Sequence, residues 1–454
     1  MNDLKVKNPV RIAVAVVVLA GIASAFYFGW PHQQNATRGG VAHADAGSPS
    51  AAGKSGALSI ARFDPPKGFP DSSGITVGSA DAVVSGGLAY SFDGSDTQGG
   101  SDDGDQVPTV HAIALRSGDD RWRRPLPELT FPLTGPGLPP LAVAAAPGGG
   151  QLVYYAGIAL IKGTGTQADQ LMLKAGALDP RTGAPGWSTQ VKLPADFVDT
   201  EESITGDVEA GIVGADRDHL VVEVLDQTDD TDQEPVTFGL STTSHTLLWT
   251  ASGLDPAGLA GDAVVGVAVG DAFSDSGTPE GLNAQTGKVL WNDSSLTVLT
   301  EGESGPPAVV SPSIAAFESE GLFSDATYLL STGNGTIRKT LPDSYTCMYD
   351  QVSIVACYAG EINGASLIGF DATTLKQLWK LPDPAGTRIA PELHAAYKGL
   401  LYTAADNDDV ILNARTGADE VVVPIAPDLV VPGYGLVRDD SDGDNALLAY
   451  PATS

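Results

Sequence analysis

Apolar residues occur mostly in short runs, and segments rich in Gly, Pro and Asp separate these runs. Residues 263–269 and 394–402 are two examples. Gly contributes 54 residues and Pro 31, and both residue types favour the tight turns that join neighbouring strands. The pattern therefore predicts an all-β fold made of many short strands with close connections.

Residues 12–30 are the exception, because they form one apolar run without a charged residue. As a helix this run would be about 30 Å long, which matches the hydrocarbon core of a bilayer. Lys5, Lys7 and Arg11 precede it, and positive charges favour the cytoplasmic side of a membrane. We therefore expect a short cytoplasmic N-terminus at 1–11 and a single-pass transmembrane signal-anchor helix at 12–30 in the cell membrane.

The rest of the chain is then extracytoplasmic. The small residues at 23–25 leave an alternative, in which the apolar run is a cleaved signal peptide and the protein is secreted. Residues 31–57 are rich in Gly, Ala and Ser and have no apolar periodicity, so we expect a flexible linker there. The main domain is expected at 58–454.

A turn that is followed four residues later by a tryptophan recurs along the chain. Residues 177–183 read Ala-Leu-Asp-Pro-Arg-Thr-Gly, and Trp187 follows. Val421 takes the tryptophan position after the turn at 411–417, and a worn copy of the repeat near Gly335 has Lys339 there. Most copies are about 40–50 residues apart, which is the length of one propeller blade. The tryptophans are Trp122, Trp187, Trp249, Trp291 and Trp379, and the turn glycines are Gly118, Gly183, Gly287 and Gly417.

Each residue type in this repeat has a physical role. Asp or Asn can accept hydrogen bonds from its own turn backbone, and Gly tolerates the positive φ of a tight return. A tryptophan side chain is too large for one sheet to cover, so we expect it to pack between neighbouring sheets. His245 stands where other copies have Gly, and it is interpreted as a solvated turn residue.

The motif Ala-Leu-Asp-x-x-Thr-Gly-x-x-x-Trp resembles the repeat of pyrroloquinoline-quinone-type (PQQ-like) β-propellers. That family includes quinoprotein dehydrogenases and the outer-membrane assembly lipoprotein of Gram-negative bacteria. The resemblance covers roughly residues 75–423 and implies a β-propeller. It is specific for the fold and not for a function.

Seven copies of the signature and the strands after them favour eight blades. The last three apolar runs, near 430, 436 and 448, lack a fourth strand, and we expect residues 57–63 to supply it and close the ring. Seven blades is the alternative if the worn copy near Gly335 is only a loop.

The formal net charge of −31 excludes most nucleic-acid roles, because phosphate binding requires clustered Lys and Arg. Three acidic groups are interpreted as polar hairpin loops, with structural calcium as the alternative. The groups are Asp102, Asp103 and Asp105; Asp406, Asp408 and Asp409; and Asp439, Asp440, Asp442 and Asp444. No cofactor is otherwise expected.

The chain has two cysteines, Cys347 and Cys357, whose spacing suits adjacent strands of one hairpin. In an oxidising compartment they would form a disulfide, and two buried free thiols are the alternative. None of the six histidines has metal-ligand spacing to another, so we expect no catalytic, cofactor-binding or metal residue.

These observations predict a non-catalytic binding or scaffold propeller that is tethered to the membrane and meets a protein or cell-envelope partner. The resemblance leaves a quinone-dependent oxidoreductase as the alternative. However, family enzymes use quinone, calcium and, in one branch, adjacent cysteines, and no quinone-site residue maps onto this sequence. A sensor ectodomain is a further alternative, although 1–11 is too short for a signalling domain. No lipid-attachment cysteine follows the apolar run, unlike in the assembly lipoprotein.

Overall fold

The computed structural model describes residues 64–70, 74–79, 81–93, 107–129, 138–167, 169–194, 197, 208–226, 234–269, 276–300, 306–319, 325–360, 364–405, 408–439 and 446–453. Within these ranges the regular secondary structure consists of β-strands, and no helix of membrane-spanning length is present. The membrane helix expected at 12–30 and the linker expected at 31–57 lie outside the described residues.

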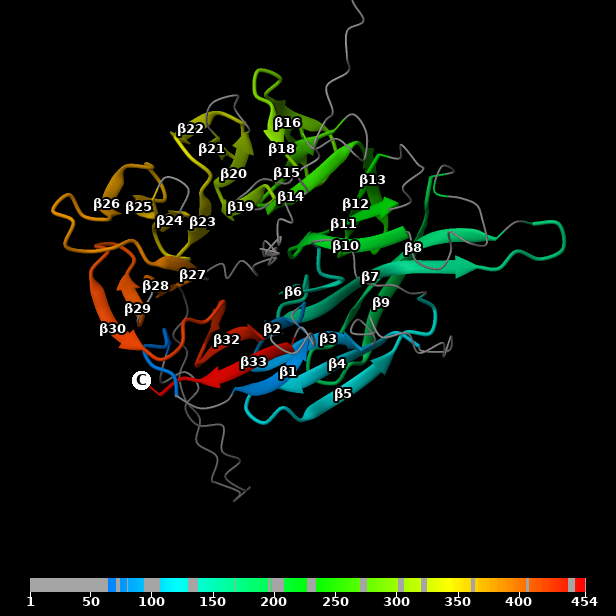
Figure 1. Cartoon of the computed structure of the whole chain (residues 1–454). Coiled ribbons are helices and arrows are strands. Elements are labelled where there is room, and N and C mark those ends of the chain that lie inside the picture. Colours follow the sequence, from blue (N-terminus) through cyan, green and yellow to red (C-terminus); the bar gives the residue numbers. More distant parts are fainter. Residues whose placement is uncertain are drawn as a thin grey trace, which may run out of the picture.

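The described strands form eight antiparallel sheets, which we call blades I–VIII (Figure 1). From the inner strand outward, blade I contains β2 (Val83–Ser85), β3 (Leu88–Asp93), β4 (Thr109–Ala114) and β5 (Asp120–Pro125); blade II contains β6 (Leu141–Ala145), β7 (Gln151–Ile161), β8 (Gln170–Leu178) and β9 (Pro185–Lys192); blade III contains β10 (Val208–Ala215), β11 (His219–Asp226), β12 (Val236–Ser241) and β13 (Leu247–Ser252); and blade IV contains β14 (Leu254–Ala260), β15 (Ala263–Ala268), β16 (Ser276–Asn283), β17 (Val289–Asn292) and the short β18 (Val298–Leu299).

The remaining blades repeat this arrangement. Blade V contains β19 (Ala308–Ser311), β20 (Ile314–Ser319), β21 (Ala326–Ser331) and β22 (Ile337–Leu341); blade VI contains β23 (Thr346–Tyr349), β24 (Ile354–Ala359), β25 (Ser366–Asp371) and β26 (Gln377–Leu381); blade VII contains β27 (Glu392–Tyr397), β28 (Leu400–Ala404), β29 (Asp409–Asn413) and β30 (Asp419–Val423); and blade VIII contains β31 (Leu429–Val431), β32 (Tyr434–Asp439), β33 (Ala446–Pro451) and β1 (Ile75–Ser79). The predicted all-β, eight-bladed propeller is confirmed.

The hydrophobic core is divided into eight clusters, and each cluster lies between two successive blades. Successive side chains of a strand point to opposite faces of its sheet, so one blade contributes to two clusters. On β15, for example, Val264 packs towards blade III, whereas Val265 and Val267 pack towards blade V. Middle strands are therefore apolar on both faces, which explains the short uninterrupted runs in the sequence.

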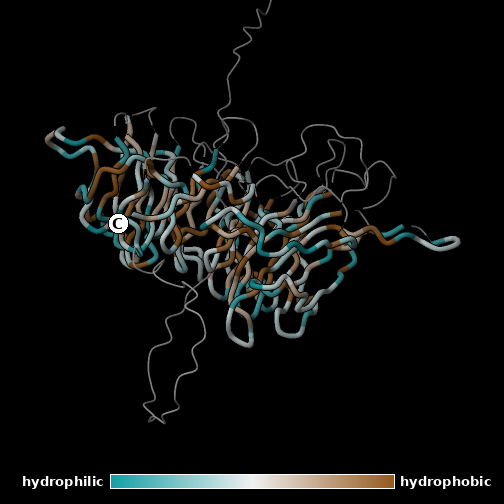
Figure 2. Tube along the Cα trace, turned by 90° about the horizontal axis from the view of Figure 1, so that it is seen from below, coloured by the Kyte–Doolittle hydropathy of each residue, from teal (hydrophilic) through white to brown (hydrophobic). Residues whose placement is uncertain are grey.

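The outermost strand of each blade has one face exposed to solvent, and its residue pattern reflects this exposure. On β13 and β17 the tryptophan is buried while its sequence neighbours are exposed or half-buried. The view in Figure 2 shows apolar stretches concentrated within the ring and hydrophilic stretches towards several of its turns. The hairpin of β7 and β8 projects beyond the other blades in Figure 1, and the sequence between these two strands is mostly polar.

The ring closes by pairing the two ends of the described chain. β1 runs antiparallel to β33, with Ile75 opposite Ala449, and thereby supplies the fourth strand of blade VIII. The prediction that an N-terminal strand completes this blade is correct, but the strand is β1 and not residues 57–63, which lie outside the described residues. The physical reason is that Val77 of β1 is fully buried in the cluster between blades VIII and I.

Tryptophans hold successive blades together by one recurring hydrogen bond. In four of the five, the indole N–H donates to a backbone carbonyl in the turn between the third and fourth strands of the next blade. The donor–acceptor distances are 3.0 Å from Trp122 to Pro180, 2.6 Å from Trp249 to Ala284, 2.8 Å from Trp291 to Thr332 and 2.8 Å from Trp379 to Ala414. Each contact couples one blade to the backbone of its neighbour.

The turn glycines at positions 183, 287, 335 and 417 leave room for the tryptophan of the preceding blade, whereas Gly118 lies against Thr76 and Ile75 of β1. Gly287 has a φ of +64°, and a Cβ atom built there would lie 2.6 Å from the Trp249 ring. Gly417 likewise has a φ of +66°, with a virtual Cβ 2.6 Å from the Trp379 ring. Glycine therefore serves two purposes, because it tolerates the left-handed backbone and leaves room for an indole from the adjacent blade.

Trp187 is the exception among the five tryptophans. The next blade has His245 at the glycine position, with a φ of 60°, and its ring stacks on Trp187 with centroids 4.7 Å apart and planes 13° apart. The indole Nε1 of Trp187 is buried and has no hydrogen-bond partner. His245 is exposed, as expected for a solvated turn residue, but its ring also covers the Trp187 indole, which a glycine at this position would leave uncovered.

The worn copy of the repeat near Gly335 is a complete blade, so the seven-bladed alternative is wrong. Lys339 of β22 takes the tryptophan position in blade V. Its Nζ lies 5.4 Å from the centroid of the Phe370 ring in blade VI, which is within the range of a cation–π interaction. A different interaction between blades thus replaces the missing indole.

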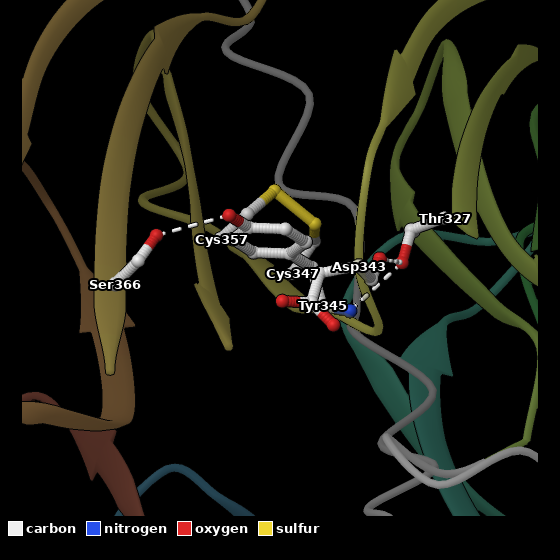
Figure 3. The surroundings of a disulfide bond; sticks show 6 residues. All are labelled: Thr327, Asp343, Tyr345, Cys347, Cys357 and Ser366. Atoms are coloured by element: carbon white, nitrogen blue, oxygen red, sulfur yellow. Dashed lines mark hydrogen bonds between the residues drawn. A yellow bond between two sulfur atoms is a disulfide. The ribbon is translucent and has the colours of Figure 1, made fainter. Parts of the chain in front are cut away.

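Cys347 and Cys357 form a disulfide between β23 and β24, where they stand directly opposite each other (Figure 3). The free-thiol alternative is therefore wrong. The loop before β23 is fixed by Tyr345, whose backbone N–H donates to Thr327 Oγ1 at 2.8 Å and whose hydroxyl lies 2.9 Å from Ser366 Oγ. The disulfide thus secures the inner edge of blade VI.

We predict that substitution by phenylalanine destabilises the protein more at Trp249 than at Trp187, because only the Trp249 indole makes a hydrogen bond. Trp249→Phe leaves the Ala284 carbonyl without its donor, whereas Trp187→Phe removes a buried N–H that has no partner. Trp249→Phe should therefore cost about 1–3 kcal/mol more in unfolding free energy than Trp187→Phe. Urea unfolding of both variants measures the difference, and equal losses would contradict the assignment.

We also predict that removing the disulfide destabilises the propeller. The bridge joins residues separated by 10 positions, and closing a loop of that length contributes about 2–3 kcal/mol by the chain-entropy model. Cys347→Ser/Cys357→Ser should lose that amount in urea unfolding. Dithiothreitol should weaken the wild-type protein equally and leave the double variant unchanged, and a reductant effect on the double variant would contradict this account.

Candidate functional site

A polar hollow opens between blades III and IV on one face of the propeller. The turns that join first to second strands and third to fourth strands emerge together on this side, which we call the turn face. The hollow has a volume of about 440 Å³ and is lined entirely by polar residues, namely Asp218, His219, Ser241, Thr243, Asp262, Asn283 and Gln285. They come from four turns, two in each blade.

His219, the first residue of β11, links the two blades at this hollow. Its Nδ1 lies 3.2 Å from Asp216 Oδ1 in its own blade, and its Nε2 lies 3.1 Å from Gln285 Oε1 in blade IV. The hydrogen bond to Asp216 raises the pKa of His219 above its ordinary value, and burial opposes this shift only in part. With an acceptor facing each ring nitrogen, the imidazolium form satisfies both contacts.

The turn before His219 is held by Asp216. Its carboxylate accepts the backbone N–H groups of Asp218 at 2.7 Å and His219 at 2.6 Å. Burial raises the pKa of Asp216, but the hydrogen bonds from His219 and these amides outweigh burial and keep the pKa below its usual range. Thr242 Oγ1 donates to the Arg217 carbonyl at 2.6 Å, so the two turns of blade III are fixed to each other.

Two carboxylates of the hollow have no direct interaction partner in the described part of the chain. Among the described residues, neither Asp218 nor Asp262 has a hydrogen-bond or ion-pair partner for its side chain, although the Asp218 charge contributes to the raised pKa of His219. The side chain of Arg217 turns away and donates to the Pro147 carbonyl in blade II at 3.2 Å. Even with His219 as an imidazolium paired to Asp216, the hollow retains two carboxylates that make no hydrogen bond or ion pair within the described chain.

The same seam contains buried acids closer to the middle of the blades. Glu223 is only 4% exposed, and its Oε1 has no hydrogen-bond partner. Burial and then the nearby Asp255 charge raise its pKa well above the ordinary value. Burial also raises the pKa of Glu209 on β10 to about 7. The apolar cluster of this seam is the smallest of the eight in the described chain.

Sequence reasoning did not identify His219, Glu223 or the hollow. Glu223 stands inside the run His-Leu-Val-Val-Glu-Val-Leu-Asp, where a charge between β-branched residues was an available signal. The hollow had no such signal, because its lining comes from separate turns of two blades. Conversely, the repeat tryptophans do not gather at one site, since each lies between its own pair of blades.

The acidic groups interpreted as polar hairpin loops, with calcium as the alternative, lie mainly outside the described residues. Asp102, Asp103, Asp105, Asp406, Asp440, Asp442 and Asp444 lie outside the described residues. Asp408 and Asp439 are described, as is Asp409, whose Oδ2 accepts the Ala426 N–H at 2.6 Å and thereby fixes the loop before blade VIII. Within the described chain, no group of three or more His, Cys, Asp or Glu side chains has an arrangement that could hold a metal ion.

Comparison with known proteins gives similarity at the level of the fold. A scan against protein-family models and a search of curated proteins found no match. BamB from Moraxella catarrhalis is 17% identical with a TM-score of 0.32, over 64% of this chain and 69% of that chain. A europium-containing methanol dehydrogenase is 11% identical with a TM-score of 0.42, over 84% of this chain and 83% of that chain.

Quinohemoprotein alcohol dehydrogenase ADHIIG from Pseudomonas putida HK5 is 11% identical with a TM-score of 0.39, over 85% of this chain and 75% of that chain. The similar folds thus include both BamB and dehydrogenases. The chain is an eight-bladed β-propeller, and its turn-and-tryptophan repeat resembles that of PQQ-like propellers. A fold of this kind does not determine a function by itself.

We predict that Glu223 makes stability depend on pH. Its pKa is raised in the folded state, so its stabilising contribution is complete below the unfolded-state pKa and is lost as pH rises towards the folded value. Glu223→Gln should therefore gain stability relative to wild type with rising pH, by at most about 1.4 kcal/mol per pH unit.

Urea unfolding from pH 4 to 9 measures this difference. Glu209→Gln is the matched control, because its pKa of about 7 makes the corresponding gain level off near pH 7. A pH-independent offset between Glu223→Gln and wild type would contradict the prediction.

Proposed function

We propose that this protein is a non-catalytic binding propeller that is tethered to the membrane and docks a protein partner on its turn face. The observation that carries the proposal is the hollow between blades III and IV, where Asp218 and Asp262 present charge that the chain itself does not neutralise. The tryptophan contacts between blades provide the rigid platform that a docking site requires.

The geometry of His219 supports a binding role over catalysis. An Asp–His pair is the arrangement that orients a general base, but such a base needs its second nitrogen free for a substrate or nucleophile. Here Nε2 faces Gln285 of the next blade, so the ring ties two blades together. Proton transfer by His219 would require this link to break.

The cysteines also do not fit the quinone site of the family's enzymes. In one branch of those enzymes the cysteines are neighbours in sequence. Here the disulfide instead joins opposite residues of β23 and β24 within blade VI. We therefore propose a function that uses no quinone or other cofactor.

Two features support a location outside the cytoplasm. The apolar run 12–30 follows Lys5, Lys7 and Arg11, which favours a signal anchor with the propeller on the outer side. The disulfide between Cys347 and Cys357 suits an oxidising compartment, because the cytosol keeps most thiols reduced. We propose a single-pass membrane protein whose linker at 31–57 lets the propeller reach its partner.

Site-specific photo-crosslinking of the full chain in its own cells tests the docking. A benzophenone amino acid at Thr243, an exposed turn-face residue beside the hollow, should give one discrete protein adduct. The same group at Ala385, an exposed residue in the connection between blades VI and VII on the opposite face, is the control and should not give that adduct.

Absence of an adduct from Thr243, together with dye-linked dehydrogenase activity of the purified chain on added quinone and calcium, would overturn the proposal. An identical adduct from both positions would show that contact is not directed to the turn face.

A further inference from the structure

We propose that the hollow between blades III and IV is the receptor for a basic side chain, arginine or lysine, of the docked protein. This inference rests on the proposed function and specifies the chemistry of its site. The hollow of about 440 Å³ has room for such a side chain, and its wall has no apolar residue to favour an aliphatic or aromatic group.

The hydrogen-bonding capacity of the wall favours a donor as the ligand. His219 uses both ring nitrogens inside the protein. Asn283 Oδ1 accepts the Thr286 N–H at 2.9 Å, and Ser241 Oγ accepts the Ser244 N–H at 3.0 Å. The carboxylates of Asp218 and Asp262 are the strongest acceptors that remain, and ammonium and guanidinium groups are their strongest complements.

Equivalent turn positions differ between blades in whether they carry a cation. The motif Asp-Pro-Arg-Thr-Gly of blade II and the motif Asn-Ala-Arg-Thr-Gly of blade VII place Arg181 and Arg415 in the turn. At the seam of blades VI and VII, hydrogen bonds from Thr374 lower the pKa of Asp371, and the charge of Arg415 adds to this effect. Blade IV has the neutral Gln285 at this position, as blades III and VI have Thr243 and Thr373, so this turn contributes no cation to the III–IV seam.

The nearby basic residues do not compensate for this substitution. Arg217 is directed towards blade II, where it donates to Pro147, and Lys288 is not part of the lining. Instead, Gln285 accepts the hydrogen bond from His219 and thereby fixes the back of the hollow. The position that supplies a cation in blade VII therefore helps to shape an acidic recess in blade IV.

Nuclear magnetic resonance of the full chain in detergent micelles, labelled with ¹³Cε1-histidine, tests the inference. The sequence contains six histidines, and His219→Gln identifies the His219 signal. Titration with Nα-acetyl-arginine amide should shift this signal in a saturable manner. The neutral isostere Nα-acetyl-citrulline amide should leave it unchanged, because citrulline has the same shape without the charge.

Asp218→Asn and Asp262→Asn should each weaken the apparent affinity about two- to fivefold, as expected for partly solvated ion pairs. Asp119→Asn is the matched control, since it removes one exposed carboxylate from the turn face of blade I and should have no effect. Equal shifts by arginine and citrulline, or equal weakening by all three variants, would overturn the inference.

Saturation of the His219 shift by calcium chloride, without a response to the arginine amide, would also overturn the inference and would make the hollow a metal site.

The proposed function can fail separately from this inference. Loss of the Thr243 adduct in cells with an intact response to the arginine amide would reject docking, whereas an adduct that survives Asp218→Asn/Asp262→Asn would reject only the basic side chain.

Discussion

Packing between successive blades is the interaction on which this structure depends. No single sheet encloses a core, because the side chains of each sheet are divided between two neighbouring clusters. The indole of one blade then donates to the turn backbone of the next, and the turn glycine leaves room for it. Each blade is therefore stable only next to its neighbours, and β1 must pair with β33 so that no blade lacks a partner.

The seam between blades III and IV departs from this pattern in a consistent way. Its apolar cluster is small, and Glu223 and Thr237 are buried there. A hydrogen bond of 3.1 Å from Thr237 to the Leu254 carbonyl and the link from His219 to Gln285 provide polar contacts instead. Polar contacts between blades lose less stability on exposure to water than apolar contacts do. This seam is therefore compatible with an open hollow at its edge.

Recognition of a charged group at such a site has a physical advantage. Asp218 and Asp262 belong to turns that hydrogen bonds and neighbouring blades already hold in place, so a partner would not have to order them. The excess negative charge of the whole chain would also attract a basic partner from a distance, and salt would weaken that attraction. Binding would then be strongest at low ionic strength.

The sequence by itself determined the repeated unit and favoured eight blades and a disulfide, because each depends on residues close together in the chain or at a regular spacing, and the structure excluded the alternatives of seven blades and free thiols. Glycine, Asp or Asn, and tryptophan specify a turn and an outgoing strand locally. Only the tertiary structure decided that β1 closes the ring, that His245 covers Trp187, and that four turns form one hollow. These features join residues of different blades, and no local pattern records which side chains the closed ring brings together.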